Sequence, residues 1–229
     1  MNEIEGIVLS SIDYKEKSKI VYLYTPYGHE SIKANGSKVS KNGLLAFTQT
    51  LNTVAYIKSS SKFPSLIEYN LVDNAFSLTN SIEKMDLIPI FIEIIKNIPE
   101  DSDHLKTYEF VKGILIEFKK TTEPKKLFCI FMIKMLYVFG VNPELKHCIS
   151  CGSSEISYFS IISGGALCYK CSNKFDLKNY KLWYEYYYDK KAIDLYSDTN
   201  FNKLLIDIIK YYEYYVHLYF KINIDKKIK

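Results

Sequence analysis

The sequence predicts an α+β protein: a five-stranded OB-fold β-barrel over residues 1–77, followed by an α-helical domain over residues 78–229 that carries a four-cysteine zinc module at about 145–175. Three observations lead to this prediction. The first 76 residues contain short segments with the composition and two-residue periodicity of strands. After Asp73 the apolar periodicity becomes helical. Two Cys-x2-Cys pairs then interrupt the helical part.

Five segments are expected to form the barrel. Residues 4–10 alternate between two faces, and residues 20–25 are β-branched and aromatic and end at the turn Pro26-Tyr27-Gly28. The full set of expected strands is 4–10, 20–25, 31–34, 47–58 and 66–72. Five short strands suit a small barrel whose closure hides its edges. Other small barrels fit the same pattern, so the strands alone leave the topology open.

The helical part is expected to begin with two helices. Asn80 and Glu83 can form a capping box for a helix that runs towards residue 98. Pro89 lies inside that helix and should kink or split it, because proline lacks the N–H that the helix requires. Asp101 or Ser102 can cap the next helix.

Two further helices follow. Pro124 suits a first helical turn and Gly140 can end the same helix, whose residues between these two are apolar on nearly all sides. We therefore expect it to be the buried centre of the domain, with Cys129 as a core residue. The last helix is expected over 200–222.

Four of the five cysteines have the spacing of a tetrahedral zinc site: Cys148 and Cys151 form one pair, Cys168 and Cys171 the other, and sixteen residues separate the pairs. Soft thiolates select zinc over magnesium or calcium. An iron–sulfur cluster or a redox dithiol are the alternatives, and His147 is an alternative ligand. Four thiolates leave no open coordination position, so the zinc is expected to be structural.

The composition excludes several classes. The chain of 229 residues is 48% hydrophobic and 24% charged, which excludes a disordered or fibrous protein. It has no apolar run of 18 residues, and it begins acidic where a signal peptide is basic, so a soluble cytoplasmic protein is expected. It has neither a phosphate-binding glycine motif nor a nucleophile–base pattern, so no enzymatic activity is expected. The net charge of +4 permits an anionic partner without requiring one.

Several motifs occur in an order that resembles the bacterial RecO family of recombination-repair proteins over essentially the whole chain. They are the opening Gly6-Ile7-Val8-Leu9, Asp13-Tyr14, Thr25-Pro26-Tyr27-Gly28, Asn35-Gly36-Ser37-Lys38, Leu136-Tyr137-Val138-Phe139-Gly140, Pro143-Glu144-Leu145, Phe159, Gly164-Gly165 and the four cysteines. The resemblance implies an N-terminal OB-fold, a helical C-terminal domain and a zinc module inserted in the latter.

The resemblance also implies a function. A member of this family binds single- and double-stranded DNA and anneals complementary strands in the cytoplasm, associated with the nucleoid. It acts with RecR, and in many bacteria with RecF, to load RecA on DNA that is covered by single-strand-binding protein. The loop after the third strand, often rich in arginine and lysine in the family, carries only Lys38 and Lys41 here.

Lysines on the barrel loops are the candidate DNA-binding residues: Lys15, Lys17, Lys19, Lys33, Lys38 and Lys41. All 30 basic residues are lysine, so the arginine fork that reads guanine is absent and contacts to the DNA backbone are expected. Tyr14, Tyr22, Tyr24 or Tyr27 can stack on bases. Without the resemblance, solvated lysines and core tyrosines would be the favoured interpretation. The alternative function is a zinc-stapled adaptor that binds proteins through its helical domain.

Overall fold

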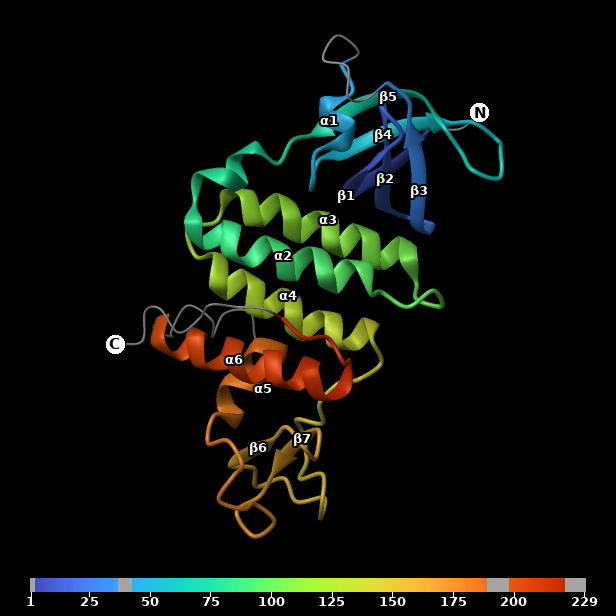
Figure 1. Ribbon diagram of the computed structural model, residues 1–229. Helices are drawn as coiled ribbons and strands as arrows, with labels where there is room; N and C mark the ends of the chain where they lie inside the picture. Colours follow the sequence, from blue (N-terminus) through green and yellow to red (C-terminus); the bar gives the residue numbers. More distant parts are fainter. Residues whose placement is uncertain (1–2, 37–42, 189–197, 221–229) are drawn as a thin grey trace. The chain divides into compact units, whose positions relative to one another are not determined.

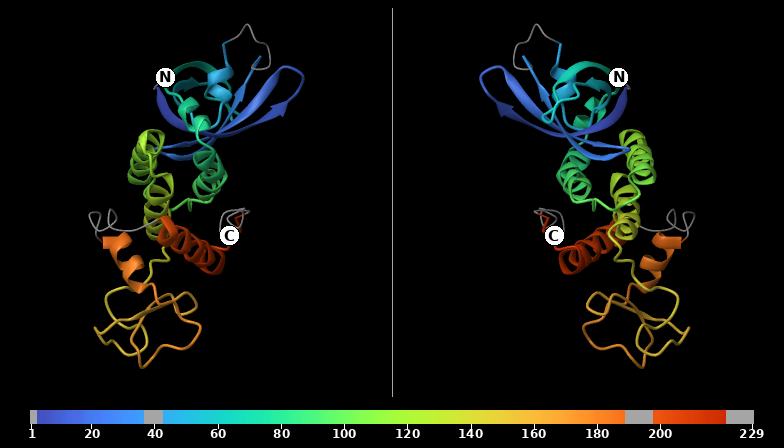
Figure 2. Two further views of the ribbon diagram at one scale, coloured as in Figure 1. Left: turned by 90° about the vertical axis from the view of Figure 1, so that its left-hand side faces the viewer. Right: turned by 90° about the vertical axis from the view of Figure 1, so that its right-hand side faces the viewer.

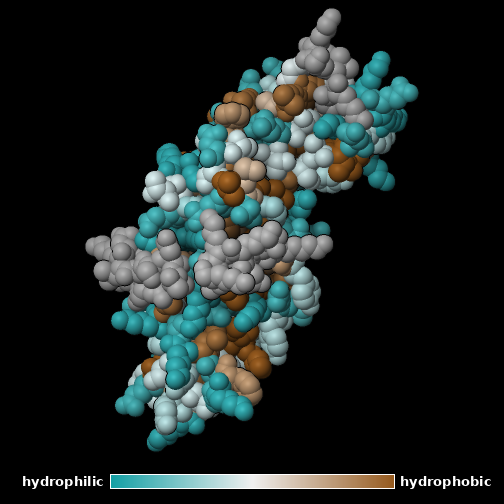
Figure 3. Space-filling model, turned by 60° about the vertical axis from the view of Figure 1, so that its left-hand side comes forward, coloured by the Kyte–Doolittle hydropathy of each residue, from teal (hydrophilic) through white to brown (hydrophobic). Residues whose placement is uncertain are grey.

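The computed structural model describes residues 3–36, 43–188 and 198–220 (Figure 1). The chain divides into two compact units, Met1–Lys120, here the barrel unit, and Thr121–Lys229, here the helical unit. Within the described ranges no helix is both long and apolar enough to cross a membrane. The face drawn in Figure 3 is mostly hydrophilic, with its hydrophobic side chains in separate groups.

The barrel unit begins with five antiparallel strands, as the sequence predicts. They are β1 (Ile4–Tyr14), β2 (Ser18–Thr25), β3 (Gly28–Ala34), β4 (Thr53–Lys58) and β5 (Leu66–Asp73), in the sheet order β3-β2-β1-β4-β5. The sheet closes between its two edges, where Lys33 of β3 and Ser65, just before β5, form a parallel bridge and the Lys33 N–H donates to Pro64 O at 2.9 Å. This order and closure are those of an OB-fold.

One face of the sheet forms the barrel core. Its members are completely buried and come from four strands and a short helix: Val8, Val21, Leu23, Ile32, Ala34, Phe47, Val54 and Tyr56. The strand register explains why these residues form the core, because residues directly opposite each other on neighbouring strands share a face. Val21 lies opposite Ile32, and Val8 lies opposite Leu23, so the apolar residues of the three strands point the same way.

The predicted fourth strand at 47–58 is wrong in its first half. Residues Leu45–Thr48 form the short helix α1, and the strand begins only at Thr53. Leu51 has a φ of 65°, which a continuous strand does not allow. The Asn52 side chain holds this turn: its amide donates to Ala46 O at 2.8 Å, and its carbonyl accepts from the Ala75 N–H at 2.9 Å.

Two helices complete the barrel unit, after the 3-10 helix η2 (Phe76–Asn80): α2 (Ile82–Lys96) and α3 (His104–Lys120). The capping residues differ from the predicted ones. The Ser81 hydroxyl, not Asn80, accepts from the Lys84 N–H, and Asp103 Oδ1 accepts from the Lys106 N–H. Pro89 neither splits nor ends α2, because apolar side chains before and after it, among them Leu87 and Ile90, stay buried.

Helices α2 and α3 lie side by side next to the barrel (Figure 2). Glu5 of β1 accepts hydrogen bonds from the Tyr108 hydroxyl at 2.8 Å and from Lys112 Nζ at 2.6 Å. Near the other end of α3, Lys119 Nζ pairs with Asp73 at 2.5 Å. These contacts explain why the compact unit extends to residue 120. The domain boundary at 77 stays a prediction from the sequence.

The helical unit contains α4 (Pro124–Val138), α5 (Tyr180–Tyr188) and α6 (Asp198–Tyr215). Pro124 begins α4 and Gly140 follows its end with a φ of 69°, both as predicted. Cys129 is completely buried, which confirms its prediction as a core residue. The last helix is shorter than the predicted 200–222, and the sequence did not predict α5.

Candidate metal centre and nucleic-acid interface

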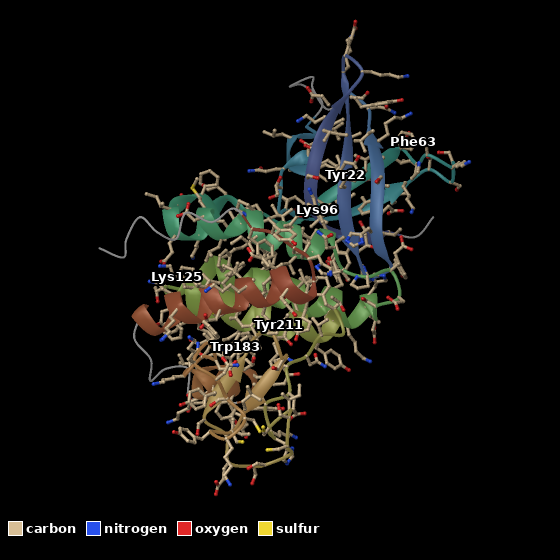
Figure 4. All side chains as sticks on the ribbon, turned by 60° about the horizontal axis from the view of Figure 1, so that its bottom comes forward. Tyr22, Phe63, Lys96, Lys125, Trp183 and Tyr211 are labelled. Carbon is tan, nitrogen blue, oxygen red and sulfur yellow. The ribbon has the colours of Figure 1, made fainter. Side chains whose placement is uncertain are left out.

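The four paired cysteines lie in a small module of the helical unit that also holds strands β6 (Tyr158–Ser160) and β7 (Gly165–Leu167). Their sulfur atoms all lie within 4.8 Å of one another. Sulfur atoms gather in this module in Figure 4 as well. The structure therefore brings together the four predicted ligands Cys148, Cys151, Cys168 and Cys171.

The donor set fits a tetrahedral metal ion. A tetrahedron with metal–sulfur bonds of about 2.3 Å has edges of about 3.8 Å. The Cys151 and Cys168 sulfurs are 3.6 Å apart, close to this edge and far beyond the roughly 2.05 Å of a disulfide. His147, the alternative ligand in the sequence, is not a member of this cluster.

Tight turns place the sulfur atoms. At the first pair, the Gly152 N–H donates to Cys148 O at 2.8 Å, and Gly152 has a φ of 76°. At the second pair, the Cys171 N–H donates to Cys168 O at 3.2 Å. The Glu144 carboxylate orients the chain that enters the first pair, because it accepts from the backbone N–H groups of residues 146 and 147.

The environment of Cys148 favours its thiolate form. Burial opposes ionisation, but the backbone N–H groups of Cys168, Ser150 and Cys151 outweigh burial and lower the pKa of the Cys148 thiol to about 6. The Cys171 thiol behaves in the opposite way, because hydrogen bonds with Cys151 and Cys168 raise its pKa to about 12. Four cysteines of this kind hold a metal once all are deprotonated, since the thiolate is the ligand.

Aromatic packing attaches the module to the rest of the helical unit. Phe159 of β6 stacks on Trp183 of α5, with ring centroids 4.1 Å apart, and both side chains are completely buried. Tyr211 of α6 packs against both rings, and Figure 4 shows Trp183 and Tyr211 close together. The aromatic cluster thus orders one end of the four-cysteine module, and the four sulfur atoms lie at its other end.

Gly165 is a position where a side chain would not fit. A Cβ atom there would lie 2.5 Å from Glu144 O, because the Ala166 N–H donates to the same oxygen at 2.7 Å and draws the two segments together. We expect Gly165→Ala to lower the free energy of unfolding of the helical unit by about 1–3 kcal/mol. Urea denaturation measures the change. Gly113→Ala, on α3 of the barrel unit, controls for the added methyl group, since a Cβ there meets nothing within 4 Å. A Gly165→Ala variant as stable as the unmodified protein would contradict the prediction.

The structure separates the candidate lysines of the barrel. Lys15 and Lys17 lie in the exposed turn between β1 and β2, and Lys33 lies on β3. Lys19 lies on β2 and pairs with Asp13 at 3.9 Å. Lys38 and Lys41 lie outside the described residues. The structure thus places Lys15 and Lys17 together at one hairpin.

The tyrosines fall into different environments. Tyr24 is completely buried, its hydroxyl 3.2 Å from His104 Nδ1, and burial raises its pKa. Tyr27 is exposed in the turn between β2 and β3. Tyr14 and Tyr22 instead lie on the sheet face opposite the core, because their strand partners, Ser18 and Ser10, are not core residues.

Phe63 joins Tyr14 on the barrel surface, although the sequence did not single it out. It lies in the loop between β4 and β5, is exposed, and packs edge-on against Tyr14 with ring centroids 6.2 Å apart. Figure 4 labels Tyr22 on the sheet and Phe63 on this loop. Tyr14, Tyr22 and Phe63 are called the aromatic platform below. The loop after the fourth strand borders the ligand face of an OB-fold, which is the signal that could have identified Phe63.

A five-stranded OB-type barrel followed by a helical unit with four clustered cysteines defines a class of OB-fold proteins that could hold a metal ion in the helical part. Comparison with known families identifies which one. Residues 1–75 match the family described as Recombination protein O N terminal, and residues 80–187 match Recombination protein O C terminal. The chain belongs to the RecO family of DNA repair and recombination proteins.

Similar proteins agree with this assignment, and each carries the name DNA repair protein RecO. The relative from Listeria monocytogenes is 31% identical over 179 residues, which cover 76% of this chain and 70% of the relative. The relatives from Halalkalibacterium halodurans and Bacillus subtilis are each 27% identical, over 96% of this chain and 92% of their own length.

Proposed function

We propose that this protein is a non-enzymatic recombination mediator. It binds single- and double-stranded DNA without sequence preference, anneals complementary strands, and acts with RecR and RecF to load RecA on DNA covered by single-strand-binding protein. It works in the cytoplasm, at the nucleoid. Membership of the RecO family supports the role in repair and recombination. The arrangement of the barrel surface supports the DNA-binding step.

The observation that carries the proposal is the aromatic platform beside the lysines of the barrel. Tyr14 ends β1 at the turn that holds Lys15 and Lys17, and Lys15 Nζ lies 5.4 Å from the centre of the Tyr14 ring. Lys33 faces the same way as Tyr22, because its partner across the ladder, Ile20, is two residues from Tyr22. Aromatic rings that stack on bases next to ammonium groups that neutralise phosphates are what a single-stranded DNA surface requires.

The metal ion of the four-cysteine module is proposed to be zinc with a structural role. Four thiolates at tetrahedral spacing suit Zn²⁺ and exclude the oxygen-preferring Mg²⁺ and Ca²⁺. Its ligands Cys148, Cys151, Cys168 and Cys171 fill every coordination position, so the ion has no site for substrate. It would therefore fix the fold of the module.

The proposed DNA surface is tested by the double variant Lys15→Ala/Lys17→Ala. Each phosphate contact contributes about −0.7 to the log–log dependence of single-strand affinity on salt, so the slope should become shallower by roughly 1 to 1.5. Affinity should fall equally for unrelated sequences, because an ammonium group on phosphate carries no base information. Fluorescence anisotropy with labelled oligonucleotides over a salt series measures both. The corresponding change is expected for Lys38→Ala/Lys41→Ala.

The matched control is Lys96→Ala/Lys120→Ala, which removes the same charge from exposed positions on α2 and α3 of the same unit. It should keep the slope of the unmodified protein. An unchanged slope in the turn variant would show that these lysines only solvate the hairpin. Absence of DNA binding by the unmodified protein at micromolar concentration would favour the adaptor function instead.

A further inference from the structure

The four-cysteine module contains a groove that neither the metal site nor the barrel surface uses. Its volume is about 630 Å³, and it lies in the segment that follows Cys168. The side chains that matter for its chemistry are Tyr158, Tyr169, Lys170, Lys174, Asp176 and Lys178. Because the loop from Tyr169 to Lys178 contains Cys171, the same turn that presents a metal ligand also forms the groove.

Local hydrogen bonds hold the loop in one conformation. The Ser172 hydroxyl donates to Tyr169 O at 3.0 Å, and the Phe175 N–H donates to Asn173 Oδ1 at 2.8 Å. At the far end of the loop, Leu177 and Phe159 exchange two backbone hydrogen bonds of 2.8 Å each. The groove is thus preformed. A ligand does not have to order the loop, so the entropic cost of binding is lower.

The charge of the groove is positive. Among the described residues, no carboxylate lies within 4.0 Å of the ammonium groups of Lys170, Lys174 or Lys178. The single acidic residue, Asp176, is engaged by the loop itself, since its Oδ2 accepts from the Asn173 N–H at 2.7 Å. Three exposed lysines on one concave surface therefore suit an anionic ligand.

Exposed aromatic rings accompany the lysines. The side chains of Tyr169 and Phe175 are each 77% exposed, so both rings are open to a ligand. Lys174 Nζ lies 5.0 Å from the centre of the Phe175 ring. Lysines and exposed rings on a common loop match the two parts of a nucleotide, because the phosphate takes a cation and the base takes a ring face.

We propose that the groove formed by residues 169–178 is a second single-stranded DNA site, separate from the barrel surface. The proposal rests on the proposed function in one respect, the choice of DNA as the anion. It adds that the metal, by fixing the turn at Cys171, orders a DNA contact as well as the fold. A chain with two separate strand-binding surfaces can hold two single strands at once, which annealing requires.

The test is the triple variant Lys170→Ala/Lys174→Ala/Lys178→Ala of the full-length, metal-loaded protein, titrated with a labelled oligothymidylate over a salt series. If all three lysines contact phosphates, the log–log salt slope should become shallower by about 2. The matched control is Lys181→Ala/Lys203→Ala/Lys210→Ala, which removes the same charge from exposed positions of the same unit outside the groove. It should leave the slope unchanged.

A second measurement uses the unmodified protein and so does not depend on the stability of a variant. Photo-cross-linking to an oligonucleotide that carries 5-iodouracil, followed by mass spectrometry, should identify Tyr169 or Phe175. The barrel variant Lys15→Ala/Lys17→Ala should retain this cross-link, so failure of the barrel surface and failure of the groove are distinguishable.

Three outcomes would overturn the proposal. Equal slopes for the groove variant and its control would show that the groove lysines contact DNA no more than other surface lysines of the unit. If the groove variant lost its zinc but kept the salt slope of the unmodified protein, the lysines would serve to balance the charge of the thiolates and not to contact DNA. Competition for the groove by an acidic peptide, without any cross-link to DNA, would assign it to a protein partner.

Discussion

Replacing Cys151 by serine is expected to destabilise the helical unit as strongly as replacing Cys148, although Cys151 is exposed and Cys148 is buried. Packing alone would predict a large effect only at the buried position. Metal coordination predicts equal effects, because each ligand is needed to close the tetrahedron. A structural zinc ion contributes on the order of 10–16 kcal/mol, against about 5–15 kcal/mol for the stability of a whole domain. Each variant should therefore lose more than about 4 kcal/mol, beyond the usual range for one substitution.

Elemental analysis and thermal denaturation measure the two parts of this prediction. The unmodified protein should contain one zinc ion per chain, and both serine variants should contain less. Cys129→Ala is the control, because Cys129 is buried in α4 outside the cluster and its removal should leave the zinc content unchanged. A Cys151→Ser variant with full zinc content and an unchanged melting temperature would show that the four sulfurs are not a metal site.

The cysteine cluster was the part of the site most open to prediction from sequence. Two residues between the members of a pair restrict both sulfurs to one tight turn, so the spacing alone brings them together. The barrel strands were predictable from β-branched and aromatic composition. Which face is buried was less predictable, because Ile7, Val8 and Leu9 of β1 are all buried, on both faces of the strand. In both cases a local pattern dictates the structure.

Long-range contacts decided the features that the sequence did not reveal. Phe47, Thr48 and Thr50 are residue types that favour strands. The Asn52 side chain nevertheless bonds to Ala46 and Ala75 and turns the chain. Helix α5 is rich in aromatic residues, which have only moderate helix propensity. It is stabilised by the stack of Trp183 on Phe159, which lies 24 residues earlier in the sequence.

The candidate DNA-binding residues were also predictable only in part from the sequence. Lysines could be recognised by type, but their faces could not be assigned without the register. The ladder pairs Lys19 with Asp13 and Lys33 with Ile20, and only the latter shares the face of Tyr22. The groove in the four-cysteine module was not predicted, because it depends on how the turn at Cys171 folds back on Tyr158.

Replacing Tyr22 by alanine is expected to weaken single-stranded DNA binding roughly 5- to 150-fold, which corresponds to the loss of about 1–3 kcal/mol for one stacked base. Tyr22 lies on the sheet face opposite the core, so its removal leaves the eight buried residues of the barrel core in place. The salt slope should stay the same, because an uncharged ring releases no counterions. Fluorescence anisotropy at several salt concentrations separates this effect from that of the lysine variants.

Tyr27→Ala is the matched control for the stacking argument. Tyr27 is 81% exposed and lies only five residues away, but in the turn between β2 and β3 and outside the aromatic platform. Tyr22→Phe should retain the affinity, since phenylalanine offers the same ring face to a base. Equal losses from Tyr22→Ala and Tyr27→Ala would mean that exposed tyrosine anywhere on the barrel contributes. A change of salt slope in Tyr22→Ala would mean that the variant has displaced the lysines, and either result would contradict stacking on the platform.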